Sequence, residues 1–295
     1  MLWAYHILCL KGGASMIKIG KISYTNILPI YYFFNEQQFN DQVSFIPQIP
    51  AQLNRQMKQG KIDLGPISSF AYAENASSYV LFPDLSISCK GKVRSIFLFS
   101  KKPVEELDQA RIALTSSSAT SVALLKILLQ HFYGLNPSYD TMEPSLESML
   151  MDHDAALLIG DDAIHAQEQN RVPFVYDLGE LWYKFTQRDM TFAVWAVRKE
   201  ITQQYPELLL EVYNEFQRSK AKGLQKMDKI VLELSQTFGQ STSFWETYFR
   251  GLSYDFSDSQ IESLEYFYGL AHRLGLLDVA NPVELWNPKQ GISIQ

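Results

Sequence analysis

A dense run of hydroxyl side chains, Thr-Ser-Ser-Ser-Ala-Thr-Ser, occupies residues 115–121 between an expected strand and an expected helix. The first backbone N–H groups of a helix have no partner inside the helix, and the helix dipole makes that end positive. Hydroxyls beside such groups form a socket for an oxyanion, and here the geometry suits a carboxylate. The candidate contacts are Ser117, Ser118, Thr120 and Ser121. The alternative is an ordinary helix N-cap, where Ser and Thr are favoured in any case.

The same run differs from a nucleotide-binding loop. Loops that cradle a pyrophosphate are rich in glycine, and residues 115–121 contain neither glycine nor proline. We therefore expect a small carboxylate ligand here rather than a nucleotide.

Two further polar loops, at residues 23–26 and 66–69, also follow expected strands. Ligands of open α/β sheets bind outside the carboxyl ends of the strands, where such loops lie. All three loops are uncharged and precede a helix, as expected for a cleft that holds a small anion. The candidates from these two loops are Ser23, Asn26, Ser68 and Ser69. Each of them also has a purely structural interpretation as a turn or cap residue.

The alternation of expected strands and helices predicts an α/β protein with parallel sheets covered by helices. Apolar runs and turn signals place strands at 17–22, 43–46, 62–66, 79–85 and 95–100, and helices at 28–34, 50–59 and after 66. After a break at 101–103 the pattern restarts, with strands at 111–114, 155–159 and 174–176 and helices at 119–132, 161–168 and 178–185. A strand at 191–197 precedes helices at 200–217, 221–238, 242–250 and 258–274.

This order predicts two lobes joined by chain crossings near residues 100 and 193. The first lobe comprises residues 16–100 plus 193–295, and the second comprises residues 101–192. Two α/β lobes with two crossings form a hinged clamp, and the polar loops of both lobes then face a shared cleft.

The composition argues against several classes of partner. The net charge is −6, and no run of Lys or Arg is interleaved with aromatic residues, so we expect neither nucleic acid nor an acidic membrane as a partner. The two cysteines and five histidines show no metal-ligand spacing. We expect no metal, and the oligomeric state, monomer or homodimer, stays open.

Residues 1–15 stand apart from the rest of the chain. Their apolar stretch is too short to span a bilayer and lacks the cationic start of a signal peptide. We expect a disordered extension there and a cytoplasmic protein, although a secretion signal is the alternative.

Several sequence blocks stand in order between residue 17 and about residue 200. They are GKISYTNILP at 20–29, GPISS at 65–69, FPDLSIS at 82–88, VRS at 93–95, ATSVALL at 119–125, LLIGD at 157–161, YDLGE at 176–180 and FAVWA at 192–196. Together they resemble the chorismate dehydratases of the futalosine route to menaquinone. The helical C-terminal third resembles that family only in outline.

The resemblance implies a two-lobed fold like the type II periplasmic binding proteins, with a hinged cleft used as an active site. It implies removal of water from chorismate, a small dicarboxylate, to give 3-[(1-carboxyvinyl)oxy]benzoate, with no metal or organic cofactor. It also places Asn26 and Ser95 in the cleft as catalytic residues. Asn26 would hold the substrate hydroxyl or a carboxylate, and Ser95 would donate to the leaving oxygen.

Gly160 and Asp161 stand where a sibling family, which makes 1,4-dihydroxy-6-naphthoate, tends to carry a His–Glu pair with His as the base. The missing histidine argues against the sibling activity, and we count both residues as substrate-binding candidates. Asp84 and Asp161 are also candidate bases. No motif places a histidine or paired carboxylates in the cleft, which suggests that the enolpyruvyl carboxylate of chorismate itself takes the proton.

One alternative of a different class remains at this stage. The same clamp serves non-enzymatic solute-binding proteins for small carboxylates, whose ligands also suit hydroxyl-rich helix ends. The weak signal segment and the lack of a linker after a lipid-anchored cysteine argue against it.

Overall fold

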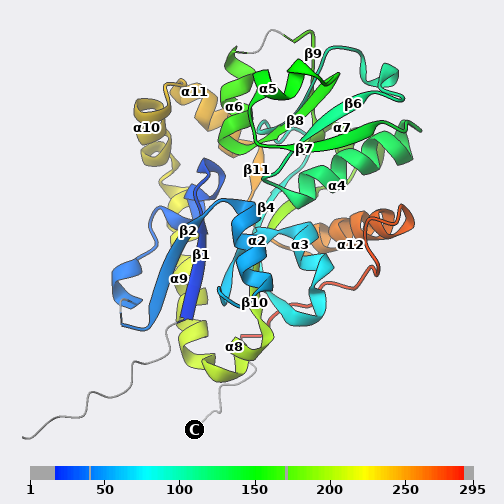
Figure 1. Ribbon diagram of the computed structural model, residues 1–295. Coiled ribbons are helices and arrows are strands. Elements are labelled where there is room, and N and C mark those ends of the chain that lie inside the picture. The colour runs from blue at the N-terminus through cyan, green and yellow to red at the C-terminus, as the bar shows by residue number, and fades with distance from the viewer. Residues whose placement is uncertain (1–16, 40, 170–171, 289–295) are drawn as a thin grey trace, which may run out of the picture.

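The computed structural model of this chain describes residues 17–39, 41–169 and 172–288. It contains two β-sheets, each covered by helices (Figure 1). The expected extension at residues 1–15 lies outside the described residues. The first sheet has the strand order β11-β4-β10-β3-β1-β2 and the second has the order β7-β6-β8-β5-β9. The expected α/β architecture with two lobes is confirmed.

The strands of the first sheet come from both ends of the chain. They are β1 (Ile17–Ile22), β2 (Val43–Gln48), β3 (Leu64–Ser68), β4 (Tyr79–Cys89), β10 (Met190–Arg198) and β11 (Leu252–Ser253). Strand β1 pairs in parallel with β2 and β3, whereas β10 runs antiparallel to both β3 and β4. The returning strand β10 therefore lies in the middle of this sheet.

The second sheet is built from the central part of the chain. Its strands are β5 (Ile96–Ser100), β6 (Arg111–Thr115), β7 (Ser138–Met142), β8 (Ala155–Ile159) and β9 (Phe174–Asp177). Strand β6 is parallel to β7 and β8, and β5 is antiparallel to β8 and β9.

Strand β5 belongs to the second lobe, whereas the sequence predicted that the first lobe extends to residue 100. Ile96–Ser100 pairs instead with β8 and β9 of the second sheet, so the chain crosses before Ile96. The Asp177 carboxylate turns the chain there by accepting the N–H groups of Val93 at 3.1 Å and Arg94 at 2.7 Å. Arg94 takes a left-handed φ of 59° in this turn.

Most helices lie near the expected ranges, but no helix was expected at Leu146–Met151, and the break expected between 217 and 221 lies instead at Lys226. The helices are α1 (Leu28–Tyr31), α2 (Pro50–Lys58), α3 (Ser69–Glu74), α4 (Ala119–Ile127), α5 (Leu146–Met151), α6 (Gly160–Gln169), α7 (Leu178–Thr186), α8 (Lys199–Gln204), α9 (Pro206–Gln225), α10 (Met227–Phe238), α11 (Thr242–Arg250) and α12 (Asp258–Arg273). Helices α8 and α9 replace the single helix expected at 200–217, because a residue before proline disfavours helical backbone and Pro206 begins α9. No helix among the described residues is long and apolar enough to cross a membrane.

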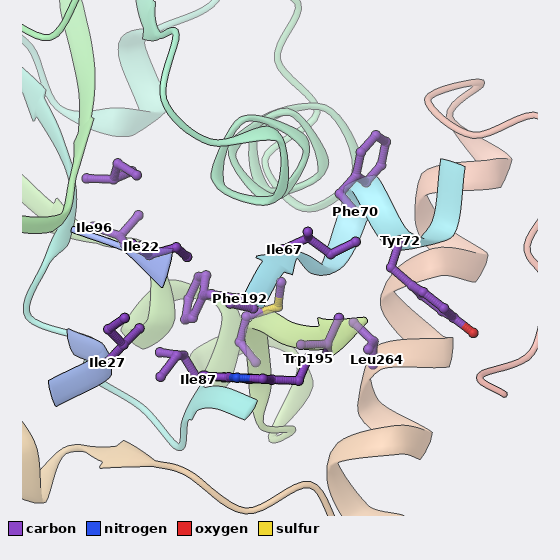
Figure 2. Packing of buried hydrophobic residues seen from close by; sticks show 14 of the residues in the cluster. Ile22, Ile27, Ile67, Phe70, Tyr72, Ile87, Ile96, Phe192, Trp195 and Leu264 are labelled. Atoms are coloured by element: carbon purple, nitrogen blue, oxygen red, sulfur yellow. The ribbon is translucent and has the colours of Figure 1, made fainter. Parts of the chain in front are cut away.

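The core of the first lobe is organised around β10. Trp195 is fully buried and stacks on Tyr31 of α1 with ring centroids 6.2 Å apart, while Phe216 of α9 meets it edge-on at 6.3 Å. Figure 2 shows side chains from distant parts of the chain, among them Ile22 and Leu264, gathered in the same core. The C-terminal helices are thus packed into the lobe that the N-terminal strands begin.

Two helical glycines test how tightly α9 is packed. A β-carbon on Gly223 would lie 2.0 Å from the Pro29 carbonyl oxygen, whereas one on Gly269 would meet nothing within 4 Å. We expect Gly223→Ala to lower the free energy of unfolding by roughly 1–3 kcal/mol through overpacking. Gly269→Ala, the matched control in α12, should raise it by about 0.5–1 kcal/mol. Urea unfolding of both variants measures the two changes, and an equal effect at the two sites would contradict the close contact of α1 with α9.

Candidate active site

A cavity of about 540 Å³, counting the part open to solvent, lies between the two sheets. Its polar wall consists of Tyr24, Asn26, Ser68, Ser95, Ser118 and Ser121, together with Gly160. Its apolar wall consists of Ile22, Pro50, Ile87, Val93, Ile96, Ile159, Phe192, Ala193 and Leu252. Figure 2 shows Ile22 of the first sheet close to Ile96 of the second, where the two lobes meet at this cavity. Tyr24 is the one titratable residue among these wall residues.

The start of α4 delivers two hydroxyls to the cavity. Ser118 is the N-cap of the helix, and its Oγ accepts the N–H of Ser121 at 3.2 Å. Ser118 also donates to the Ser121 hydroxyl at 3.1 Å, so the two side chains share one hydrogen-bonded unit. The expected helix start at this place is confirmed. A carboxylate placed beside it would meet both hydroxyls and the positive end of the helix.

Thr120 points away from the cavity and joins the lobes instead. Its Oγ1 accepts the N–H of Phe70 at 3.0 Å, lies 2.9 Å from the Ser68 hydroxyl and donates to the Phe192 carbonyl at 3.2 Å. The Thr120 N–H in turn donates to Ser68 Oγ at 3.1 Å. Ser69 is also fully buried, 3.1 Å from Thr120 Oγ1, and donates to the Thr191 carbonyl at 2.7 Å. These hydroxyls hold the start of α3 against the start of α4.

Two other predicted contacts also lie off the cavity wall. Ser117 is buried, and its backbone N–H donates to Thr115 Oγ1 at 3.2 Å. Ser23 is exposed to solvent at the end of β1. The structure therefore brings Asn26, Ser68, Ser95, Ser118, Ser121 and Gly160 together, but not Ser23, Ser69, Ser117, Thr120 or Asp161.

Asn26 presents an acceptor without a partner. Its Oδ1 is inaccessible to solvent and forms no hydrogen bond with the described part of the chain, although the side chain lines the cavity. A buried polar atom left unpaired costs about 1–3 kcal/mol, so it indicates a place where a ligand donates. Because Oδ1 can only accept, the matching ligand group carries a proton.

Ser95 sits at the crossing between the lobes, almost fully buried. Its Oγ donates to the Val93 carbonyl at 3.4 Å and accepts a hydrogen bond from the Tyr248 phenol at 3.3 Å. Tyr248 belongs to α11, and sequence reasoning missed it. The helix is so rich in aromatic residues that its pattern indicated only a core helix, and nothing in its spacing pointed towards Ser95.

Gly160 occupies a position that leaves no room for a side chain such as histidine. Its φ is +61°, its N–H donates to the Ser95 carbonyl at 2.7 Å, and a β-carbon here would lie 2.7 Å from Tyr24 Cδ2. Any side chain at this position strains the backbone and collides with the Tyr24 ring. Burial and the neighbouring carboxylates raise the pKa of Tyr24 to about 12, against the lowering effect of a hydrogen bond with Ser117.

Asp161 ties α6 of the second lobe to the turn after β1. Its carboxylate accepts the Thr25 hydroxyl at 2.6 Å and the Thr25 N–H at 3.2 Å. Burial raises the pKa of this carboxyl, and the two hydrogen bonds from Thr25 oppose the rise.

Asp84, the other candidate base, lies outside the cavity wall and forms an ion pair there. Its carboxylate pairs with the buried Lys220 at 2.9 Å, and Lys220 also contacts Asp255 at 2.9 Å. Neither Asp84 nor Asp161 therefore lines the cavity. Among the described residues, no three His, Cys, Asp or Glu side chains come together as a group that could hold a metal ion.

The sequence of this chain is similar to known proteins over most of its length. Residues 17–273 match the sequence profile of a family described as menaquinone biosynthesis. A chorismate dehydratase of Thermus thermophilus is 33% identical over 273 residues, which cover 88% of this chain and 95% of that protein.

Solved structures confirm the expected fold. A protein of Archaeoglobus fulgidus superposes with a TM-score of 0.72 at 17% identity, covering 89% of this chain and 98% of that one. The periplasmic aliphatic sulphonate binding protein of Escherichia coli follows with a TM-score of 0.68 at 15% identity, covering 95% and 94%. At these identities the likeness concerns the fold alone, which is that of periplasmic binding proteins.

The contact between Asp161 and Thr25 generates a pH prediction. Because folding raises the pKa of Asp161, the folded state binds this proton more tightly than the unfolded state, and stability falls as pH rises through the raised pKa. Asp161→Asn keeps an acceptor for Thr25 but removes the charge. We expect the stability of the variant relative to wild type to increase as pH rises from about 4, the ordinary pKa of an Asp, through the raised pKa of Asp161.

Urea unfolding across this pH range measures the difference in free energy of unfolding. Thr25→Val is the matched variant: it removes the hydroxyl donor at 2.6 Å, leaves the carboxylate buried, and should lose about 1–3 kcal/mol at pH 7. An Asp161→Asn difference that does not change with pH would contradict the burial of a charged carboxylate between the lobes.

Proposed function

This chain belongs to the menaquinone biosynthesis family, and on that premise we propose that it is a chorismate dehydratase. It converts chorismate to 3-[(1-carboxyvinyl)oxy]benzoate and water, which makes it a carbon–oxygen lyase of the hydro-lyase type. The observation that carries the proposal is the 33% identity to a chorismate dehydratase over 88% of this chain. The interlobe cavity supports it, because its wall offers neutral hydrogen-bonding groups from both lobes to a dicarboxylate.

Substrate binding depends on fixed dipoles rather than on cations. We assign one carboxylate of chorismate to Ser118 and Ser121 at the start of α4, where the helix dipole favours negative charge. Ser68 lies across the cavity on the other lobe and is a contact for the remaining polar groups. The unpartnered Asn26 Oδ1 accepts the proton of the ring hydroxyl, the substrate group that can donate there. Ser69, Ser117 and Thr120 shape this wall from behind.

The reaction is an elimination that ends in an aromatic ring. The enolpyruvyl carboxylate takes the ring proton beside the ether, and the bond between carbon and the hydroxyl oxygen breaks. The departing hydroxide then receives that proton and leaves as water, which regenerates the carboxylate. Ser95 donates a hydrogen bond to the leaving oxygen. Aromatisation drives the reaction, so the protein contributes chiefly orientation and preorganised hydrogen bonds.

The proton acceptor is the enolpyruvyl carboxylate of the substrate in this proposal. Tyr24 is the only titratable residue among the described wall residues, and its pKa of about 12 keeps it protonated at neutral pH. Asp84 and Asp161 are both engaged elsewhere, with Lys220 and Thr25 respectively. The substrate carboxylate, held beside its own ring, then serves as the base without help from a protein side chain.

Incubation of the pure protein with chorismate tests the activity directly. Chromatography should show the aromatic product, whereas isochorismate and prephenate, the control substrates, should not give it. Ser95→Ala should lower kcat by about 10²–10³-fold, as expected for a donor to a developing negative charge. Ser118→Ala should act mainly by raising KM. A folded wild-type protein that leaves chorismate unchanged would overturn the proposed function.

The pH dependence of kcat tests the assignment of the base. Without a protein base, kcat should stay constant between about pH 6 and pH 9, because the substrate carboxylate is already ionised and Tyr24 titrates only near pH 12. Tyr24→Phe, Asp84→Asn and Asp161→Asn should each keep kcat within about 10-fold of wild type. A loss of about 10⁴-fold in a folded variant, at the upper limit typical of general bases, would show that its side chain takes the proton.

A further inference from the structure

Helix α11, from the C-terminal third of the chain, contacts the candidate site at the crossing between the lobes through Tyr248. We propose that Tyr248 is a positioning residue for Ser95: by donating its phenolic proton to Ser95 Oγ, it leaves the single Ser95 proton for the leaving hydroxyl of the substrate. This inference rests on the proposed function and assigns a role to a part of the chain outside the sequence blocks that resemble the family.

The hydrogen bonds of Ser95 determine where its proton can go. A serine hydroxyl has one proton and two acceptor positions. Tyr248 donates into Ser95 Oγ at 3.3 Å, which occupies one acceptor position, and the Val93 carbonyl lies 3.4 Å away. Both hydrogen bonds are long, so the Ser95 proton can turn from the Val93 carbonyl to another acceptor while the Tyr248 phenol still donates to Ser95 Oγ. A substrate oxygen in the cavity, where Ser95 forms part of the wall, therefore receives that proton readily.

The surroundings of Tyr248 keep it a donor. The residue is fully buried, and its ring packs against Phe249 at 5.2 Å and Trp245 at 5.7 Å between ring centroids. Burial raises the pKa of this phenol, and the nearby Asp161 carboxylate adds to the rise. The phenol stays neutral, and the aromatic packing fixes the position of its oxygen beside Ser95 Oγ.

Tyr254 provides a matched control, because it is a second buried tyrosine in the same part of the molecule. Its hydroxyl has no hydrogen-bond partner among the described residues, and it does not line the cavity. Tyr254→Phe therefore removes the same atom from a similar environment without touching Ser95. We expect its kcat and KM to equal those of wild type.

A double-mutant cycle on Tyr248 and Ser95, with chorismate as substrate, tests the inference. Tyr248→Phe keeps the ring contacts and should lower kcat about 10-fold, less than the loss of a donor that touches the reacting atoms, with KM within about twofold of wild type. In the Ser95→Ala background the same substitution should change kcat less than about twofold, because its only route to the substrate is gone. Circular dichroism and thermal unfolding confirm that all variants are folded.

The outcomes of these measurements separate the role of Tyr248 from the dehydratase activity itself. Full activity of Tyr248→Phe, or an equal loss in both backgrounds, would overturn the role of Tyr248 while the dehydratase activity of wild type stands. A wild-type protein that does not convert chorismate would overturn the proposed function and this inference together. Should Tyr248→Phe fail to fold, 3-fluorotyrosine at position 248 keeps the hydroxyl and should retain kcat within about threefold. A 10-fold loss with that analogue would contradict a role that depends only on the O–H.

Discussion

Thr120 Oγ1 lies at one of the places where the two lobes are in contact, and its hydrogen bonds help to set the shape of the cavity. It accepts from the Phe70 N–H and donates to the Phe192 carbonyl, so a residue at the start of α4 holds α3 and β10 at fixed positions. The partners are neutral and buried, and leaving any of them unpaired is costly. Ser68 and Ser118, from different lobes, are thereby both held in the cavity wall, where each hydroxyl is already oriented by hydrogen bonds with Thr120 or Ser121.

The described residues of the cavity wall offer no cation to balance the charge of an anionic ligand. The described wall residues include no Lys, Arg or His, and the carboxylates that lie nearby are engaged with Thr25, Lys220 or backbone N–H groups. A dicarboxylate in such a site is stabilised by oriented O–H and N–H groups that do not reorganise during the reaction. The same arrangement disfavours stray proton transfer, because the wall holds no group that titrates near neutral pH.

Much of this site could be predicted from residue types and their positions relative to strand ends. Ser118 was identifiable as an N-cap, and Asn26 and Ser68 as loop residues at the carboxyl ends of strands. The sequence could not distinguish Thr120 and Ser69 from their neighbours, because successive hydroxyls at a helix start point in different directions and only packing decides which of them reach the cavity. Tyr248 was hidden for another reason: its partner Ser95 is 153 residues away, and no local pattern encodes such a pairing.

The fold shows the same division between local and distant information. Most strands and helices were predicted from apolar periodicity, but β7 (Ser138–Met142) was missed because it is an edge strand with a largely exposed, polar sequence. Strand β5 was expected in the first lobe, and this was wrong. The turn that Asp177 stabilises directs the chain into the second sheet, and the residues of β5 itself do not indicate which sheet it joins.

The contact between Gly160 and Tyr24 bears on how this chain can change over evolutionary time. Because the backbone conformation and the aromatic ring both forbid a β-carbon at position 160, a mutation there alone damages the protein before any new chemistry can arise. A smaller or displaced side chain at 24 would remove the collision, but the left-handed backbone at 160 would remain strained for any residue other than glycine. The two positions are therefore epistatic, and the order in which they mutate limits the paths from this activity to another on the same scaffold.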